Sequence, residues 1–166
     1  MDAHACFQMV TRNVADLYLK VMPQSRVDYE LSTPFQKNPK GMTWLHLVCN
    51  EGFQDAVHLF IDRKGSEKYI NALDYEGNTP IKLACKQGYY YIVMILMEKG
   101  ATIDSFVYNS TQTFLFDMKH TLFNMRSGMN YNLNHHQRKI LGTDIYYMQN
   151  NYNRLISALQ NSRTVM

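Results

Sequence analysis

The residues best suited to metal or acid–base chemistry are three histidines in the C-terminal third of the chain, His120, His135 and His136. A protein zinc site needs three or four ligands, and these usually come in pairs at short, recognisable spacings. Adjacent histidines on a strand or loop point apart, and no third ligand follows at a diagnostic distance along the chain. We therefore expect neither a metal site nor a cofactor.

Other catalytic motifs are absent from the sequence. There is no Gly-Lys-Ser/Thr phosphate loop, no Gly-x-Ser-x-Gly elbow and no paired-carboxylate motif. The chain has three cysteines, an odd number, at positions 6, 49 and 85. Their spacing is too wide for a redox or metal motif. We expect Cys49 and Cys85 to be small, buried apolar residues, and reduced thiols fit a cytosolic or nuclear protein. The chain is therefore not expected to be an enzyme.

The composition indicates one globular domain. The chain has 166 residues, of which 46% are hydrophobic and 19% charged, so it is long enough to bury a core. A net charge of +3 is too small to predict a nucleic-acid or membrane partner. No secretory signal is seen, and no apolar run approaches the ~20 residues of a membrane span. We expect a cytoplasmic monomer.

The sequence is organised around one pattern that occurs twice, at 41–52 and at 77–88, with a shift of 36 residues. Five pairs of residues are identical: Gly41/Gly77, Thr43/Thr79, Leu47/Leu83, Cys49/Cys85 and Gly52/Gly88. A repeat of this period predicts a solenoid, and solenoids usually bind partners rather than catalyse.

Each copy predicts a pair of short helices. We expect helices over 43–50 and 53–63, an extra piece at 66–69, and then helices over 78–86 and 89–99. A shift of 33 residues aligns a degraded third copy, which predicts helices near 111–118 and 121–127. Apolar stripes predict a further helix at each end, over 4–22 and over 144–160, with Thr143 or Asp144 as the cap of the second. We interpret these end helices as caps on the stack.

The pattern Gly-x-Thr-Pro-x-x-Leu-Ala, with a glycine four residues on and a second helix ending in Gly-Ala, resembles the ankyrin repeat. Gly77, Thr79, Pro80, Leu83 and Ala84 carry the resemblance, and the first copy adds a Leu-His pair. The departures are Trp44 in place of Pro and Lys82 in place of His. The resemblance implies an all-α solenoid divided as follows: N-terminal cap 1–36, repeat 1 at 37–70, repeat 2 at 71–103, degenerate repeat 3 at 104–134 and C-terminal cap 135–166.

By the same resemblance, a partner would contact the turn tips and the exposed side of the inner helices. On this sequence these positions are Lys40, Asp74, Tyr75, Glu76, Lys82, Lys86, Tyr108 and Asn109. Tyr75 and Tyr108 fall at equivalent tips, where an exposed ring suits a binding hot spot. The alternative is that each ring packs on the neighbouring tip. Trp44 is either an aromatic anchor or a residue buried against the N-terminal helix, and His46 is expected to be a structural hydrogen-bonding residue.

The leading hypothesis is a non-enzymatic adaptor that binds a partner protein, and its small size resembles that of host-targeting effectors and viral relatives of the inhibitors of NF-κB. One alternative is an enzyme with an active site in the terminal segments, in a pocket lined by His135, His136, Asp117 or Cys6. The other is a structural subunit of a larger assembly, docked through the apolar stripe of the first helix.

Overall fold

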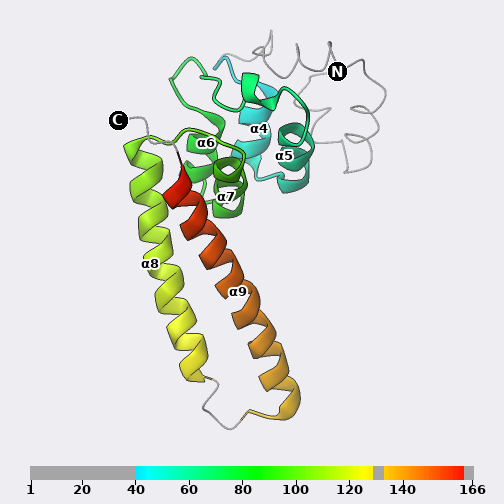
Figure 1. Ribbon diagram of the computed structural model, residues 1–166, viewed down its shortest axis with the longest axis vertical. Helices are drawn as coiled ribbons and strands as arrows, with labels where there is room; N and C mark the ends of the chain where they lie inside the picture. Colours follow the sequence, from blue (N-terminus) through cyan, green and yellow to red (C-terminus); the bar gives the residue numbers. More distant parts are fainter. Residues whose placement is uncertain (1–39, 129–132, 163–166) are drawn as a thin grey trace.

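The computed structural model describes residues 40–128 and 133–162, and all structural statements below concern these residues. The helix expected over 4–22 lies outside them, as does the segment 24–39. Four short helices form a compact body, and two long helices project from it as an antiparallel hairpin (Figure 1).

The short helices form two pairs. The first pair is α4 (Trp44–Glu51) and α5 (Gln54–Ile61), and the second is α6 (Pro80–Lys86) and α7 (Tyr90–Glu98). A single 3-10 turn, η1 (Ser66–Lys68), follows α5, where the extra piece was predicted. All four helices predicted for the two copies are confirmed, with ends that differ by no more than two residues.

Local signals explain where these helices begin and end. The Thr43 hydroxyl accepts from the His46 amide at 3.5 Å, and the His46 ring accepts from the Thr43 amide at 3.1 Å, which forms a reciprocal cap on α4. Gly52 then ends α4 with a φ of 77°, in the left-handed region that glycine adopts without strain. Thr79 caps α6, and Pro80 occupies its first position, where no hydrogen-bond donor is lost.

The core runs continuously through both helix pairs. Six consecutive residues of α7, from Ile92 to Met97, are buried because other helices cover α7 on several sides. Cys49 and Cys85 are buried free thiols, as the sequence predicted, and burial raises the pKa of each. Tyr69 is fully buried below the long turn between the pairs, and its hydroxyl donates to the Phe60 carbonyl at 2.7 Å.

The C-terminal part departs from the sequence prediction in two ways. The two short helices expected near 111–118 and 121–127 are one helix, α8 (Ser105–Gly128). The last helix, α9 (His135–Asn161), begins earlier than predicted and passes through Gly142 without a break. Its cap is Asn134, whose side chain accepts from the Gln137 amide at 2.8 Å, so the prediction of Thr143 or Asp144 as the cap was wrong.

Pairing between the two helices explains both departures. Leu115 and Leu122 of α8 are buried and lie seven residues apart. Ile145, Leu155 and Leu159 of α9 are also buried, at steps of ten and four residues, so each set lies on one face of its helix as in a two-helix seam. No Gly or Pro interrupts α8 before its end, and one glycine within a helix costs only about 1 kcal/mol. A continuous seam outweighs that cost.

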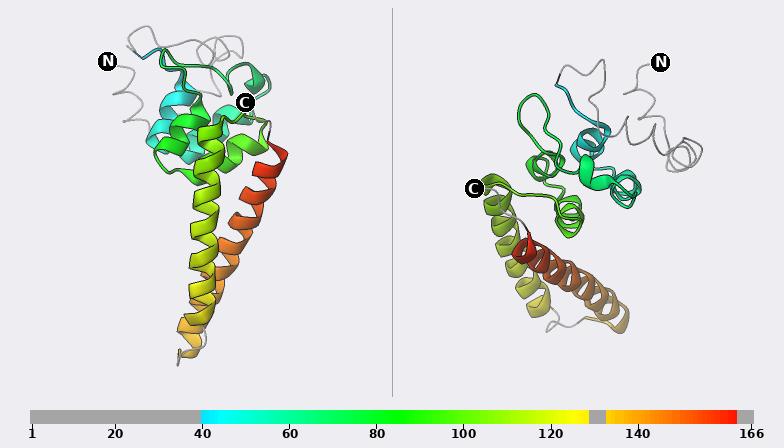
Figure 2. Two further views of the ribbon diagram at one scale, coloured as in Figure 1. Left: turned by 90° about the vertical axis from the view of Figure 1, so that its left-hand side faces the viewer. Right: turned by 45° about the horizontal axis from the view of Figure 1, so that its top comes forward.

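The hairpin is anchored to the repeats at one end. α9 packs against α7, and α8 packs against α6, while the distal half of both helices extends away from the body (Figures 1 and 2). The Phe114 ring stacks on Tyr90, with ring centroids 3.9 Å apart, and Arg154 forms an ion pair with Glu98 at 2.8 Å. Among the described helices, none is both long enough and apolar enough to cross a bilayer.

Candidate protein-binding surface

The turn between η1 and α6 presents one aromatic side chain to solvent. Asp74 lies at its base, buried, and its carboxylate accepts from the amides of Glu76 at 2.9 Å and Asn78 at 2.7 Å. The Asn78 side chain also donates to this carboxylate, at 3.0 Å. Burial alone would raise the pKa of Asp74, but these hydrogen bonds outweigh it and the pKa lies below its ordinary value. Asp74 was expected at the exposed tip; the structure turns its carboxylate inward to shape the tip.

Tyr75 is held by its backbone and exposes its ring. Its amide donates to the Lys40 carbonyl at 2.8 Å, which joins this turn to the segment before α4. The ring lies over Gly41, where an added Cβ would be only 2.4 Å from it. Even so, 75% of the residue is exposed. The two interpretations of Tyr75 therefore combine, because one side of the ring packs on the neighbouring turn and the rest is free for contact.

Lys40 and Glu76 flank this ring. Both side chains are well exposed, and Lys40 Nζ lies 4.0 Å from Glu76 Oε1. An exposed pair at this distance contributes at most about 1 kcal/mol to stability. Both charges therefore stay accessible to a partner beside Tyr75.

His46 fixes the turn to the inner helix of the preceding repeat. Its Nδ1 accepts from the Thr43 amide, so in the neutral ring the proton is on Nε2, which donates to the Asn78 carbonyl at 2.9 Å. Burial lowers the pKa of His46, which keeps the ring neutral. The prediction of a structural role for His46 is confirmed. Its side chain is a positioning element for the Tyr75 turn.

The two lysines expected on the inner-helix face have different environments. Lys82 is half-buried, pairs with Asp104 at 2.7 Å and lies 6.0 Å from the centre of the Phe106 ring. Burial would raise the pKa of Asp104, but the bond and charge of Lys82 together with the amides of Val107 and Phe106 outweigh it, so the pKa is lowered. Lys82 thus ties α6 to the start of α8. Lys86 is exposed, and its amine donates to the Asn78 side chain at 2.7 Å.

Tyr108 and Asn109 are not at a turn tip. They lie in the first turns of α8, because Asp104 caps that helix by accepting from the Val107 amide at 2.9 Å. Asn109 is exposed, whereas the Tyr108 hydroxyl accepts from Gln112 at 3.3 Å. The expected equivalence of Tyr75 and Tyr108 was therefore wrong, and Tyr108 belongs to a separate surface.

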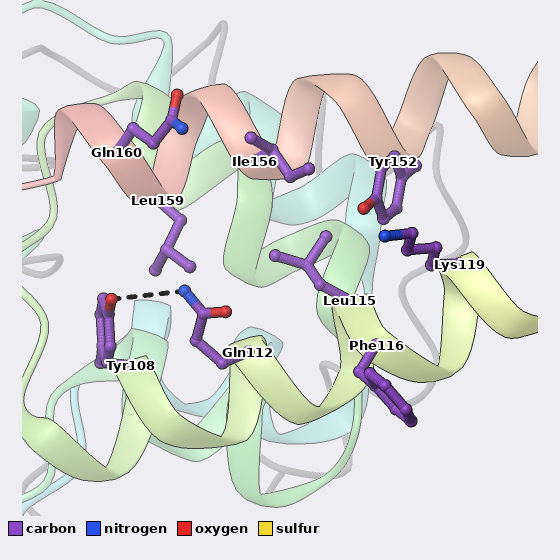
Figure 3. Close-up of a pocket in the computed structure, with 9 residues that line it drawn as sticks. All are labelled: Tyr108, Gln112, Leu115, Phe116, Lys119, Tyr152, Ile156, Leu159 and Gln160. Carbon is purple, nitrogen blue, oxygen red and sulfur yellow. Dashed lines mark hydrogen bonds between the residues drawn. The ribbon is translucent and has the colours of Figure 1, made fainter.

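That separate surface is a groove between α8 and α9, with a volume of about 350 Å³ (Figure 3). Its floor is aliphatic, formed by Leu115, Ile156 and Leu159, and Lys119 contributes a cation at one end. His135, His136 and Asp117 do not line it. No histidine, cysteine or carboxylate lines the groove.

The histidines are dispersed in the hairpin. His120 is exposed and hydrogen-bonds Asn124 at 3.2 Å, and His135 and His136 are exposed at the start of α9. Within residues 40–128 and 133–162, no three His, Cys, Asp or Glu side chains gather where they could hold a metal ion.

Sequence comparison agrees with this fold. The family model described as ankyrin repeats (3 copies) matches residues 9–106, more than half of the chain. The protein therefore belongs to the ankyrin-repeat family, whose members are generally protein–protein interaction modules. The match ends at the second residue of α8, so most of the hairpin lies beyond it. The family match also includes residues 9–36, most of the segment expected to be an N-terminal cap. The boundaries predicted for the caps and the repeats stay predictions.

Two curated proteins illustrate the range of relatives. The target of rapamycin complex 2 subunit AVO2 of Saccharomyces cerevisiae is 31% identical over 67 residues, covering 40% of this chain and 15% of the relative. The NF-kappa-B inhibitor alpha of Sus scrofa is 31% identical over 75 residues, covering 43% and 24%. The chain thus matches less than a quarter of the length of each. No solved structure matches it significantly.

Proposed function

We propose that this protein is a non-enzymatic adaptor that binds a partner protein through the Tyr75 turn and the adjoining exposed side of α4 and α6. The observation that carries the proposal is the exposure of Tyr75 on a backbone that is already fixed. Its amide is bonded to Lys40, and the turn below it is closed by Asp74 and Asn78. An aromatic side chain on an ordered turn loses little entropy on binding, which suits a hot spot.

The inner-helix face extends the surface away from the tip. Gln87 donates to Asn50 at 3.2 Å, which links the exposed sides of the two inner helices. Lys86, the last residue of α6, adds an exposed cation next to Gln87. Lys40 and Glu76 lie beside Tyr75, and these groups continue the polar surface along the inner helices.

The two relatives have different assignments, one as a subunit of a complex and one as an inhibitor, so their similarity does not select a partner. A host-targeting, inhibitor-like role in the cytoplasm stays a prediction. The alternatives of an enzyme and of a structural subunit gain no specific observation from the described residues.

Affinity capture with matched variants tests the proposal. The tagged protein, Tyr75→Ala and Tyr147→Ala would each be incubated with cell lysate, and the captured proteins compared by quantitative mass spectrometry. Tyr147 is a matched control because it is also a tyrosine, is 62% exposed and lies on the distant hairpin. We expect Tyr75→Ala to reduce the recovery of specific partners about tenfold and Tyr147→Ala to leave it unchanged. Equal recovery with Tyr75→Ala would contradict the proposal.

A further inference from the structure

The α8–α9 hairpin has one side that no described part of the protein covers. On the opposite side, Phe114 stacks on Tyr90 and Arg154 pairs with Glu98, so that side meets the repeats. We call the uncovered side the outer face. It is defined by Phe116, Lys119, Phe123, Arg126, Lys139 and Tyr146.

Helical spacing and contacts place these residues together. Phe116 and Lys119 line the groove between the helices (Figure 3). Phe123 follows Phe116, and Arg126 follows Lys119, by seven residues, which is close to two full turns. Arg126 Nη2 donates to Gln149 of α9 at 2.9 Å, across the same side of the hairpin.

The α9 residues of the outer face follow the same rule. Tyr146 lies fourteen residues before Gln160, which lines the groove, and Lys139 lies seven before Tyr146. The outer face is therefore a continuous strip along both helices.

The strip is rich in exposed aromatic surface. Phe116, Phe123 and Tyr146 are 71%, 68% and 69% exposed. Two helices can bury only the seam between them, so aromatic residues on a second stripe at seven-residue spacing stay in water until another helix covers them. Exposed apolar strips of this kind mark interaction sites.

The charges on the strip have one sign. Lys119, Arg126 and Lys139 are all cationic, and α8 and α9 contain only two acidic residues, Asp117 and Asp144. Asp117 is one residue, about 100°, around the helix from Phe116. It lies near Tyr90, whose pKa is raised mainly by burial and in part by this carboxylate. Asp144 is about 200° around α9 from Tyr146, so both acids lie off the outer face.

We propose that the outer face is a second binding site, whose occupant is an acidic amphipathic helix of a partner protein that packs along the hairpin as a third helix. Its apolar stripe would cover Phe116, Phe123 and the groove, and its flanking carboxylates would pair with Lys119 and Arg126. A second copy of this chain is a poorer occupant, because it would place one cationic strip against another.

Two synthetic peptides test this site on the full-length protein. Each has about 21 residues, three heptads, with Leu at the first and fourth positions. One carries Glu at the flanking positions and the other carries Lys. By titration calorimetry we expect the Glu peptide to bind at least about tenfold more tightly than the Lys peptide, with an affinity that falls as salt is raised.

Paired variants locate the binding. Phe116→Ala/Phe123→Ala should weaken the Glu peptide about tenfold or more, and Lys119→Glu/Arg126→Glu should do the same without removing an aromatic. Ile140→Ala is the control, since Ile140 is 50% exposed and lies fourteen residues before Arg154, on the stripe of α9 that leads to the contact with the repeats. The control should change affinity less than about twofold, and circular dichroism should show all variants equally helical.

Three results would overturn the proposal. Equal affinity for the Glu and Lys peptides would mean non-specific hydrophobic binding. Equal loss in the control variant would place binding elsewhere. A dimer in sedimentation velocity that Phe116→Ala/Phe123→Ala abolishes would assign the outer face to a second copy. This site can be tested separately from the Tyr75 turn. Tyr75→Ala should leave the affinity for the Glu peptide unchanged, whether or not the Tyr75 turn binds a partner.

Discussion

At the scale of single residues, Tyr75 depends on Gly41. Gly41 has a φ of 66°, a backbone conformation that strains any residue with a Cβ. A Cβ at this position would also occupy the space of the Tyr75 ring. Gly77 has a similar φ of 74° but open space around it, so it separates backbone strain from the contact with Tyr75.

Substitution of these glycines gives the first prediction. Gly41→Ala and Gly77→Ala should each lower the free energy of unfolding by about 1–2 kcal/mol, because alanine is strained in the left-handed region. Only Gly41→Ala should also displace the Tyr75 ring, seen as a change in its NMR ring-proton shifts. Unchanged Tyr75 shifts in Gly41→Ala would show that the ring does not rest on this glycine.

His46 predicts how stability depends on pH. Its pKa is lowered by burial in the folded protein, so below its ordinary value of 6.5 the unfolded chain binds a proton that the folded chain resists. The free energy of unfolding should therefore fall as the pH drops from 7 to 5, measured by urea titration at each pH. The lowered pKa of Asp74 acts only below its ordinary value of 3.8 and does not contribute in this window.

The variant His46→Gln tests whether His46 causes this pH dependence. His46→Gln should be less stable at pH 7, because its side chain cannot reproduce all the bonds of the ring, but should lose less further stability on acidification. An equal loss between pH 7 and 5 in both proteins would mean that another group causes the dependence.

The residues of the binding turn show which features a sequence can predict. The exposure of Tyr75 and the structural role of His46 follow from their positions in a repeat, which are local. The inward carboxylate of Asp74 was missed because it depends on Asn78, four residues on, which supplies three of its hydrogen bonds. The aromatic pair Phe116 and Phe123 carried a signal, a seven-residue spacing, that only became meaningful once α8 was one helix.

At the scale of elements, the same distinction holds. The repeat helices are specified by local caps such as Thr43 and Gly52 and were predicted within two residues. The continuity of α8 was not predicted, because it depends on pairing with α9, which begins only at His135. The 33-residue shift predicted a third repeat at 104–134, but residues 105–128 form one long helix of the hairpin.

Two adjacent residues of α9 test what holds the hairpin to the repeats. Leu155→Ala should lower the free energy of unfolding by about 2–4 kcal/mol, because Leu155 is buried in the shared core. Arg154→Ala should cost less than about 1 kcal/mol, since its ion pair with Glu98 is over a third exposed and screened by solvent. Chemical denaturation compares them, and a larger loss from Arg154→Ala would show that the charge, rather than the core, fixes the hairpin.

At the scale of the whole molecule, the hairpin closes one end of the stack. α7 is buried along its whole middle and packs on α5, α6 and α9. Removing residues 105–166 would expose apolar residues of α7 that the hairpin now covers. We expect the shortened chain to unfold or aggregate at room temperature, as judged by circular dichroism and gel filtration. A monomeric, fully helical product would mean that the repeats need no C-terminal cap.

The Tyr75 turn lies on the repeats, whereas the outer face lies on the hairpin that projects from them (Figure 1). The Tyr75 turn belongs to the family's repeat unit, whereas the outer face belongs to the segment beyond the family match. This arrangement suits an adaptor that holds two partners at once.

Site-specific photo-crosslinking would show directly whether a partner protein contacts the Tyr75 turn. A benzophenone amino acid would replace Tyr75 in one preparation and Tyr147 in another, and both would be irradiated in the same lysate. We expect a discrete adduct with a partner protein from position 75 that is absent from position 147. The same adducts from both positions, or none from position 75, would contradict this expectation.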